Sequence, residues 1–315
     1  MKDVLILHIG AGCHSVSKNK RYAKLIKDAL GQKTLLETID ILEKSPLTNT
    51  GYGSNLNILG MIEIDSSFIK SNGRMGSITG LSIDCPTKEM FRIFNEIDEI
   101  YSSDKFGNDL LKPVTLNATS LKSLMNINDS SNLDYGPNRE IYNSYKNSHE
   151  FIKSNIPTQD TIGVISIKDN DTIITASSGG NFLKLPGRIG CAGIIGASIS
   201  FKKFVNDSLE ISCMCSGNGE QIIQHSLAVQ LISAIQQMNE SDYGVRLNQF
   251  ILNLDSEFYC GFIILINNLD SNRIQLLYGH TTESFHFGYK VNDDTRAILS
   301  FNESPGKFTF GEYNF

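Results

Sequence analysis

A long polar segment, residues 116 to about 158, limits how this chain can fold, because it separates two stretches of regular pattern. Asn, Ser, Lys and Asp dominate it, and such a composition is typical of a mobile segment with one short helix. The packed part of the protein must therefore come from the residues on either side.

Strand and helix patterns follow one another before this segment. The opening VLILHIGAG is an apolar run ended by glycines, as in a buried strand that leads into a tight loop. A helix is predicted from Ser17 to about Glu43, because its apolar residues approximate one face. MIEIDSSFI alternates like a half-buried strand, and TKEMFRIFNEIDEIY has the spacing of an amphipathic helix.

Strands and helices are again grouped after the polar segment. The pattern predicts strands at 161–167, 172–176 and about 209–215, a glycine-rich bend at 178–190, helices at 220–238 and about 244–255, and the strands CGFIILI, RIQLLYG and SFHFGYK. Segregated groups of this kind favour a layered α+β domain over a regular alternation of strand and helix.

Composition excludes several classes of function. The chain has 28 Lys and Arg against 34 Asp and Glu, a net charge of -6, and no dense basic cluster, so we expect it to bind neither nucleic acid nor a membrane. No apolar run reaches the length of a membrane span, and the first residues do not form a signal peptide. We therefore expect a soluble cytoplasmic protein, whose six cysteines, without a CxxC pair, are reduced packing residues.

The common cofactor and metal motifs are missing from the sequence. It contains no GxxxxGK[ST], no GxGxxG after a strand, no GxSxG and no HExxH. HTTE, from His280 to Glu283, has metal-ligand spacing only if it is helical, and it adjoins strand-like runs. We expect no cofactor and no metal.

Asp160 and Thr161 stand directly before the apolar run IGVISI. A threonine hydroxyl is a poor nucleophile until a base takes its proton, and a threonine at a chain N-terminus has its own α-amine as that base. An α-amine has a pKa of roughly 7.7 to 8.0, close to working pH. A threonine that follows a long polar segment and opens a rigid strand fits this chemistry, although Asp-Thr pairs are common and threonine also favours strands.

Three later turns hold hydroxyls, glycines or a guanidinium between strands. They are SSGG at 177–180, LPGRIG at 185–190 and SGNGE at 216–220. Each alone is most simply a tight turn, but loops on a rigid sheet are also where sites form. Their combination with Thr161 indicates a catalytic site.

In this order, the motifs resemble the asparaginase/threonine aspartase group of N-terminal-nucleophile hydrolases. HIGAGCHSVSK is similar to the opening loop of that family, and TNTGYGSNLNILGMIEIDSSFI to its Asn/Gly loop and the strand that follows. DTIGVISI, SSGG, LPGRIG and SGNGE are similar to its catalytic half, and GHTTESFHFGY most resembles the threonine aspartase (taspase) branch. The resemblance implies a four-layer αββα sandwich, one domain over 1–315.

The resemblance also implies that the precursor cuts itself between Asp160 and Thr161, into an alpha fragment 1–160, with its mobile linker at about 116–158, and a beta fragment 161–315. Thr161 is then the nucleophile. The implied supporting residues are Ser178 as the second hydroxyl, Ser216 and Gly217 as the oxyanion hole, and Arg188, Lys18 and Gly219 as substrate-binding residues, with Arg188 as the carboxylate clamp.

One position bears on the choice of substrate within the family. Members that hydrolyse amino acids place an acid three residues after the clamp arginine, where it holds the α-ammonium, and here that residue is Cys191. An Asp inside a polypeptide has no α-ammonium, so the change favours an endopeptidase that cuts protein substrates after Asp. Lys18 either shares the substrate carboxylate with Arg188 or is a surface lysine that begins a helix.

Two other readings of the family resemblance remain open: an amidohydrolase of the asparaginase or isoaspartyl-peptidase type, and a degenerate, non-catalytic member. Thr50 stands where the family usually has Ala, and DSSF replaces DASI, changes that we expect to slow self-cleavage. The two fragments should associate, with a dimer of such heterodimers as the further implied assembly. Because the segment before Thr161 lacks a basic targeting run, nuclear import stays undecided.

Overall fold

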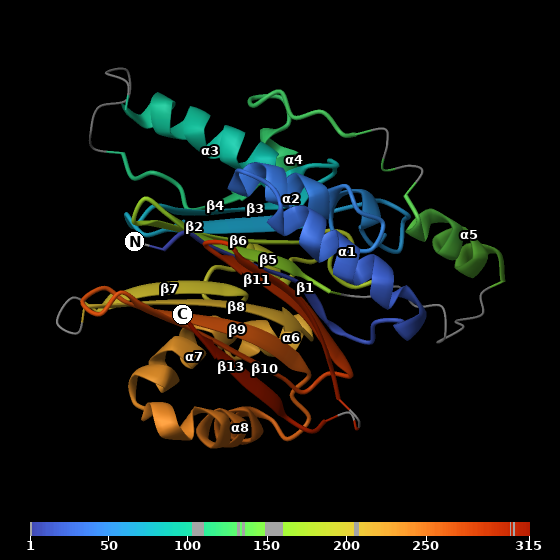
Figure 1. The fold of residues 1–315 in the computed structure, drawn as a ribbon. Coiled ribbons are helices and arrows are strands. Elements are labelled where there is room, and N and C mark those ends of the chain that lie inside the picture. Colours follow the sequence, from blue (N-terminus) through green and yellow to red (C-terminus); the bar gives the residue numbers. More distant parts are fainter. Residues whose placement is uncertain are drawn as a thin grey trace.

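The computed structural model describes residues 2–102, 110–130, 133, 136–148, 160–204, 208–302, 304 and 306–315. Two β-sheets lie face to face, and each is covered on its outer side by helices (Figure 1). The order of the layers is helix, sheet, sheet, helix, so the predicted α+β sandwich with four layers is confirmed.

The larger sheet holds the start of the chain and the strand that follows the polar segment. Its described strands run in the order β12 (Asp294–Phe301), β11 (Ser284–Val291), β1 (Val4–Gly12), β5 (Ile162–Lys168), β6 (Asp171–Ser178), β2 (Ile64–Lys70), β3 (Met75–Leu81) and β4 (Thr115–Asn117). Its helices are α1 (Asn19–Leu30), α2 (Leu35–Glu43), α3 (Pro86–Ser102) and the short α4 (Ala118–Leu121). All the pairings are antiparallel except that of β3 with β4.

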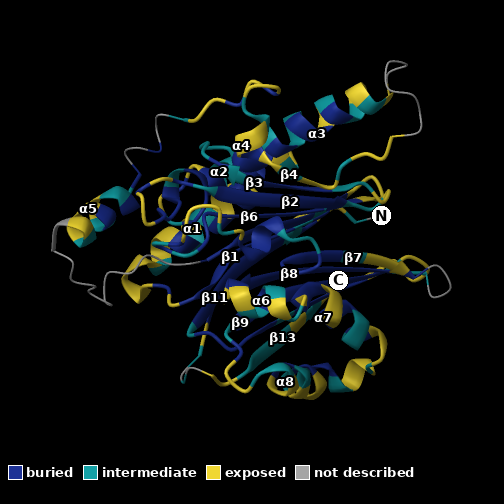
Figure 2. Ribbon diagram, turned by 180° about the vertical axis from the view of Figure 1, so that it is seen from behind, coloured by how far each residue is buried: buried dark blue, intermediate teal, exposed yellow. Residues whose placement is uncertain are grey.

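The smaller sheet comes entirely from the second half of the chain. It runs β13 (Thr309–Asn314), β10 (Arg273–His280), β9 (Cys260–Asn268), β8 (Leu209–Gly217) and β7 (Ile199–Phe204), and it is covered by α6 (Gly219–Gln224), α7 (Leu227–Gln236) and α8 (Tyr243–Leu254). Because β9 packs against the other sheet on one side and helices on the other, nearly all of CGFIILINN is buried. Figure 2 shows this burial in both central layers.

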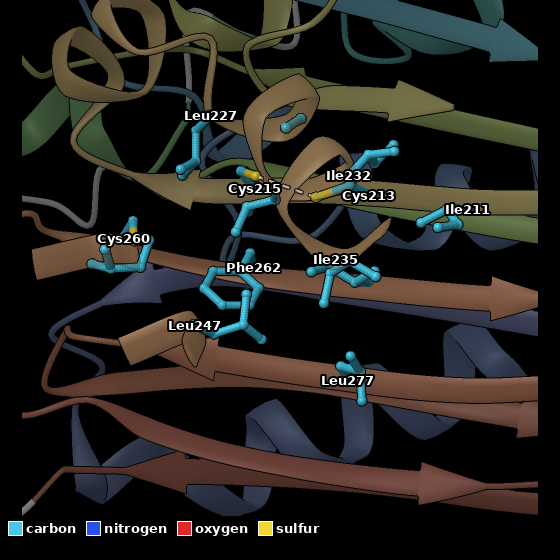
Figure 3. Close-up of a cluster of buried hydrophobic side chains, with 14 of the residues drawn as sticks. Ile211, Cys213, Cys215, Leu227, Ile232, Ile235, Leu247, Cys260, Phe262 and Leu277 are labelled. Atoms are coloured by element: carbon cyan, nitrogen blue, oxygen red, sulfur yellow. Dashed lines mark hydrogen bonds between the residues drawn. The ribbon is translucent and has the colours of Figure 1, made fainter. Parts of the chain in front are cut away.

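Part of the core lies between the smaller sheet and its helices (Figure 3). Apolar side chains of β8 and β9 meet α7 and α8 there, with Cys213, Cys215 and Cys260 among them. All six cysteines are free, and those three and Cys191 are buried, as expected for packing residues.

Two predicted helices are each divided in the structure. The helix predicted from 17 to 43 is α1 and α2, because the chain turns after Gly31 and restarts at Thr34, whose hydroxyl accepts from the Glu37 amide in a capping box. The helix predicted over 220–238 is α6 and α7, separated at Ser226, which has a left-handed φ of 46°.

The polar segment contains more ordered structure than the single short helix predicted. Besides α5 (Asn138–Ser148), it includes most of β4 and all of α4, and several of its side chains are buried against α3 and its sheet: Ala118, Met125, Ile127, Leu133 and Tyr142. Residues 149–159 of the predicted linker lie outside the described residues.

The two sheets approach each other closely at Gly261 of β9. A Cβ built there would lie 2.5 Å from the Ala11 Cβ of β1, in the opposite sheet. A methyl group at this position has no space unless the sheets separate.

Replacement of Gly261 by Ala should therefore lower the free energy of unfolding by about 1–3 kcal/mol, as overpacked core positions do. Urea denaturation measures this. Gly31→Ala is the matched control, because Gly31 ends α1 at a φ of -74° and its Cβ would meet nothing closer than 3.4 Å. Equal stability of the two variants would contradict this close approach.

Candidate active site

Thr161 lies at the start of β5, between the two sheets. Thr161 and Asp160 are 2% and 3% exposed, so the bond between them is buried in the uncut chain. Continuing the register of β5 with β6 by one residue sets Thr161 opposite Ser178, and Gly10 of β1 lies against Asp160. β1 is irregular between His8 and Ala11, and a bulge of this kind often aims a side chain at an active site.

Ser216, at the end of β8, connects the two sheets at this point. Its Oγ accepts a hydrogen bond from the Thr161 amide at 3.2 Å and another from the Ala11 amide at 3.0 Å. Ser216 was predicted to serve the oxyanion hole, but in the uncut chain its hydroxyl contacts the nitrogen of Thr161. If the bond before Thr161 is cut, that nitrogen becomes the α-amine.

The SGNGE turn is fixed by its own hydrogen bonds. Gly217 has a φ of 129°, and a Cβ there would lie 2.3 Å from the Tyr259 carbonyl oxygen, so only glycine fits. Asn218 caps α6, because its side chain accepts from the Glu220 and Gln221 amides. The turn therefore holds the Ser216 side chain in a fixed position beside Thr161.

The Asn/Gly loop secures the SSGG turn, a function that the sequence motifs did not reveal. The amides of Asn49 and Asn55 both donate to the Gly180 carbonyl, at 2.8 and 2.9 Å. The Gly179 amide donates to the Asn49 carbonyl at 2.7 Å, and the Gly180 amide donates to the Ser178 hydroxyl at 3.1 Å. Ser178 thus sits in a rigid turn.

Two of the residues that depart from the family pattern, Thr50 and Ser66, join buried polar contacts around β6 and β2. The Thr50 hydroxyl lies 2.6 Å from that of Ser177, and the Ser66 hydroxyl 3.1 Å from that of Thr87. Thr87 also donates to the Glu43 carboxyl at 2.6 Å. Burial raises the pKa of Glu43 to about 8, although its hydrogen bonds to Thr87 and Ser177 oppose the shift.

Arg188 is already paired in this structure. Its guanidinium donates twice to Glu220 Oε1, at 3.0 and 2.7 Å, and Glu220 is held by α6. A Cβ on Gly180, Gly190 or Gly219 would lie within 3 Å of the guanidinium, so these glycines leave the room that Arg188 occupies.

Lys18 does not join Arg188. It is exposed in the 3-10 turn Val16–Lys18 that precedes α1, and no ion pair joins it to a residue within the described ranges. Its sharing of a substrate carboxylate with Arg188 stays a prediction.

Cys191 contacts the proposed nucleophile. Its Sγ lies 3.8 Å from Thr161 Oγ1, and the side chain is buried. Burial raises the pKa of this thiol, and the Thr161 hydrogen bond opposes the shift only in part. Cys191 is therefore a neutral thiol at neutral pH, and neither a base nor a partner for an ammonium group.

The side chain of Asp160 lies beside β1 and the residues that follow it. Its Oδ2 is 3.2 Å from Nε2 of His14, which sequence reasoning did not single out. Burial raises the pKa of Asp160, and the His14 charge opposes this. The Asp160 carboxyl therefore meets His14 in this structure, and not Arg188, the implied carboxylate clamp.

HTTE is not helical. His280 ends β10, donating through Nδ1 to the Thr282 carbonyl oxygen at 3.0 Å, and burial lowers its pKa to about 4. No group of three His, Cys, Asp or Glu side chains in the described ranges is placed to hold a metal. Nor is any described helix both long and apolar enough to cross a bilayer.

The raised pKa of Glu43 predicts how stability changes with pH. The folded state keeps its proton up to about pH 8, whereas an unfolded Glu loses it near 4.5. The free energy of unfolding should therefore fall as pH rises from about 5 to 8. Glu43→Gln keeps a neutral side chain of the same shape, so its stability relative to wild type should rise by roughly 1 kcal/mol per pH unit in this window.

Urea titrations at several pH values test this, with the exposed Glu99→Gln as the control. A constant difference between Glu43→Gln and wild type would contradict the assignment.

The comparison with known proteins agrees with this geometry. The asparaginase family model matches residues 11–246, three quarters of the chain. Similar proteins include plant-type L-asparaginases of Pyrobaculum calidifontis, 25% identical over 75% of this chain and 81% of its own, and of Pyrococcus horikoshii, 27% identical over 71% and 76%. A probable isoaspartyl peptidase/L-asparaginase of Drosophila pseudoobscura is 24% identical over 75% and 78%. With its αββα sandwich and a threonine at the head of β5, this chain belongs to the asparaginase family of hydrolases.

Proposed function

We propose that this chain is a threonine aspartase: it cuts itself between Asp160 and Thr161, and the mature protein then hydrolyses protein substrates after Asp. The observation that carries the first step is the buried Asp160–Thr161 bond, whose nitrogen donates to Ser216. Among the described residues, β5 follows this bond, and β1 and β8 contact it through Ala11 and Ser216.

The chemistry of self-cleavage follows from the atoms present. Thr161 Oγ1 attacks the Asp160 carbonyl carbon, the C–N bond breaks, and the hydroxyl proton passes to the nitrogen. The acyl group is then an ester on Oγ1, and water hydrolyses it to leave a carboxyl group on Asp160 and a free amine on Thr161. Ser216 Oγ already lies beside the nitrogen that becomes this amine, and the amine is the base in later turnovers.

Cys191 supports an Asp-cutting endopeptidase over hydrolysis of a free amino acid. A free amino acid has an α-ammonium, which needs an acid nearby, and the side chain at this position is a neutral buried thiol. A peptide bond within a protein has no α-ammonium, so a neutral thiol at this position does not weaken the binding of a protein substrate. Arg188 is paired with Glu220 in the structure, and it is the cation that a substrate carboxylate would bind by displacing Glu220.

The relatives favour a second candidate. Their names describe L-asparaginases and isoaspartyl peptidases, so hydrolysis of small aspartyl amides by the same Thr161 is the alternative. Both candidates need the cut at 160/161, and they differ in the substrate that follows.

Self-cleavage is tested by intact-mass measurement on the purified protein. Wild type should divide into two fragments, the second beginning at Thr161, whereas Thr161→Ala should stay whole because it lacks the attacking oxygen. Thr161→Ser keeps a hydroxyl and should still divide. A wild-type chain that never divides would end both enzymatic candidates and leave a non-catalytic member of the family.

The substrate is tested by a substitution at Cys191. Wild type should cleave a peptide with an internal Asp and hydrolyse L-asparagine poorly, whereas Cys191→Asp should improve asparagine hydrolysis by roughly tenfold or more, because it adds a charged hydrogen bond to the ammonium. Cys191→Ser, a neutral change, should not. Preference of the wild type for asparagine would instead support the activity named for the relatives.

A further inference from the structure

The side chain of Asp160 lies in a pocket formed by the end of β1 and by His14, two residues beyond that strand. Gly10 and Gly12 form its wall: a Cβ on Gly10 would lie 1.9 Å from the Asp160 Cβ, and one on Gly12 would lie 2.6 Å from Oδ1. Gly10 has a φ of 108°, a conformation that disfavours any side chain. The pocket therefore exists only because both positions are glycine.

His14 closes the polar end of this pocket. Its Nε2 is 3.2 Å from Asp160 Oδ2, within ion-pair distance, and both side chains are almost wholly buried. Neither atom has a hydrogen-bond partner among the described residues, so each is the other's polar neighbour. The charged groups that act on Asp160 are His14 and, less strongly, Glu283.

The hydrogen bonds behind His14 determine which of its nitrogens carries a proton. Ser284 donates its one hydroxyl proton to the Gly12 carbonyl at 2.9 Å, so its Oγ can only accept from the His14 amide at 2.9 Å and from Nδ1 at 2.8 Å. Nδ1 is therefore protonated. A proton on Nε2 makes its 3.2 Å contact with Asp160 Oδ2 an ion pair, whereas a bare Nε2 facing a bare carboxylate would be repulsive.

The His14 ring itself is held in place. It stacks on His286, with centroids 4.1 Å apart, and meets the edge of Tyr22 at 5.1 Å. Burial lowers the pKa of His286 to about 3, so His286 is a neutral surface for the stack.

We infer that Gly10, Gly12 and His14 form the pocket that selects an aspartate on the acyl side of the bond that Thr161 attacks, first in the chain itself and then in its substrates. This inference rests on the proposed function and goes beyond it, because it assigns Asp selection to His14 and not to Arg188.

The inference follows because self-cleavage and substrate cleavage pass through the same kind of ester on Thr161. Self-cleavage passes through an ester of the Asp160 carbonyl carbon on Thr161 Oγ1, with the Thr161 amine free. Cleavage of a protein after Asp passes through the same aspartyl ester on the same oxygen, once the peptide C–N bond breaks and its nitrogen takes a proton. An acyl group with the same side chain, attached to the same atom, fits the same pocket when Asp160 has left it.

The pocket is tested by the rate of self-cleavage, followed by intact mass. His14→Phe keeps the stacked ring and removes the polar edge, so cleavage should slow roughly tenfold to a hundredfold, the loss of one charged contact with Asp160. His14→Gln places an amide near the position of Nε2 and should recover part of the rate. His225→Phe, at the end of α6 and outside this pocket, is the control, with the wild-type rate expected.

A double-mutant cycle separates this role from simple packing. Asp160→Ala should also slow cleavage, and the pair Asp160→Ala with His14→Phe should be no slower than the worse single variant, because both remove one contact. Additive slowing, or a wild-type rate in His14→Phe, would overturn the pocket while leaving the proposed function intact. A wild-type chain that does not divide would overturn the proposed function and the pocket together.

Substrate preference is measured on protein in which self-cleavage has run to completion. Wild type and His14→Gln are given matched peptides with Asp or Ala before the cut bond. The pocket predicts that His14→Gln loses part of the preference for Asp over Ala, whereas an unchanged preference would overturn its use for substrates. Thermal unfolding of each variant establishes that it is folded.

Discussion

The contact that the rest of the site depends on is the one from Ser216 Oγ to the amides of Thr161 and Ala11, at 3.2 and 3.0 Å. β8 belongs to the smaller sheet, whereas β1 and β5 belong to the larger one, so this hydroxyl fixes the two sheets to each other at the reactive bond. The spacing is narrow, because Gly261 leaves no room for even a methyl group opposite Ala11. A nucleophile gains its rate from being held in place, and here the four-layer fold itself holds it.

Ionisable side chains buried around Thr161 are either uncharged or placed beside a possible partner of opposite charge. The Cys191 thiol keeps its proton, the Glu43 carboxyl keeps its proton to about pH 8, and the Asp160 carboxyl faces His14 at ion-pair distance. Each group would be costly as an isolated buried charge, and each instead makes a hydrogen bond or contact that its neutral or paired form permits. The clearly charged pair, Arg188 with Glu220, lies farther out, where the Glu220 side chain is 58% exposed. Arg188 is thus paired near the surface, whereas the buried Asp160 side chain meets His14.

The sequence pattern indicated a layered α+β domain, and the four layers were implied by the family resemblance. Most core strands were also predicted, because β1, β5 and β9 are continuous apolar runs of the kind found in a sheet covered on both faces. The sequence pattern did not predict the helix breaks at Gly31 and Ser226, which depend on how the chain packs back on the sheet. It also missed β12 and β13, whose residues are largely exposed or half-buried and lack a clear alternation.

Thr161, Ser178, Ser216 and Arg188 were found as motif residues, and the fold brings their turns together. His14 was missed because a single histidine in a loop has no periodicity, and its meaning comes only from Asp160, which lies far along the chain.

The central claim is that the bond held by Ser216 is cut and that the nitrogen of Thr161 becomes a free amine in the same place. A crystal structure of the wild-type protein after long incubation tests this most directly. We predict a chain break between Asp160 and Thr161, with the new amine of Thr161 within hydrogen-bond distance of Ser216 Oγ and the pocket beside His14 vacated by its own chain. A continuous chain through 160 and 161 in that crystal would contradict the account.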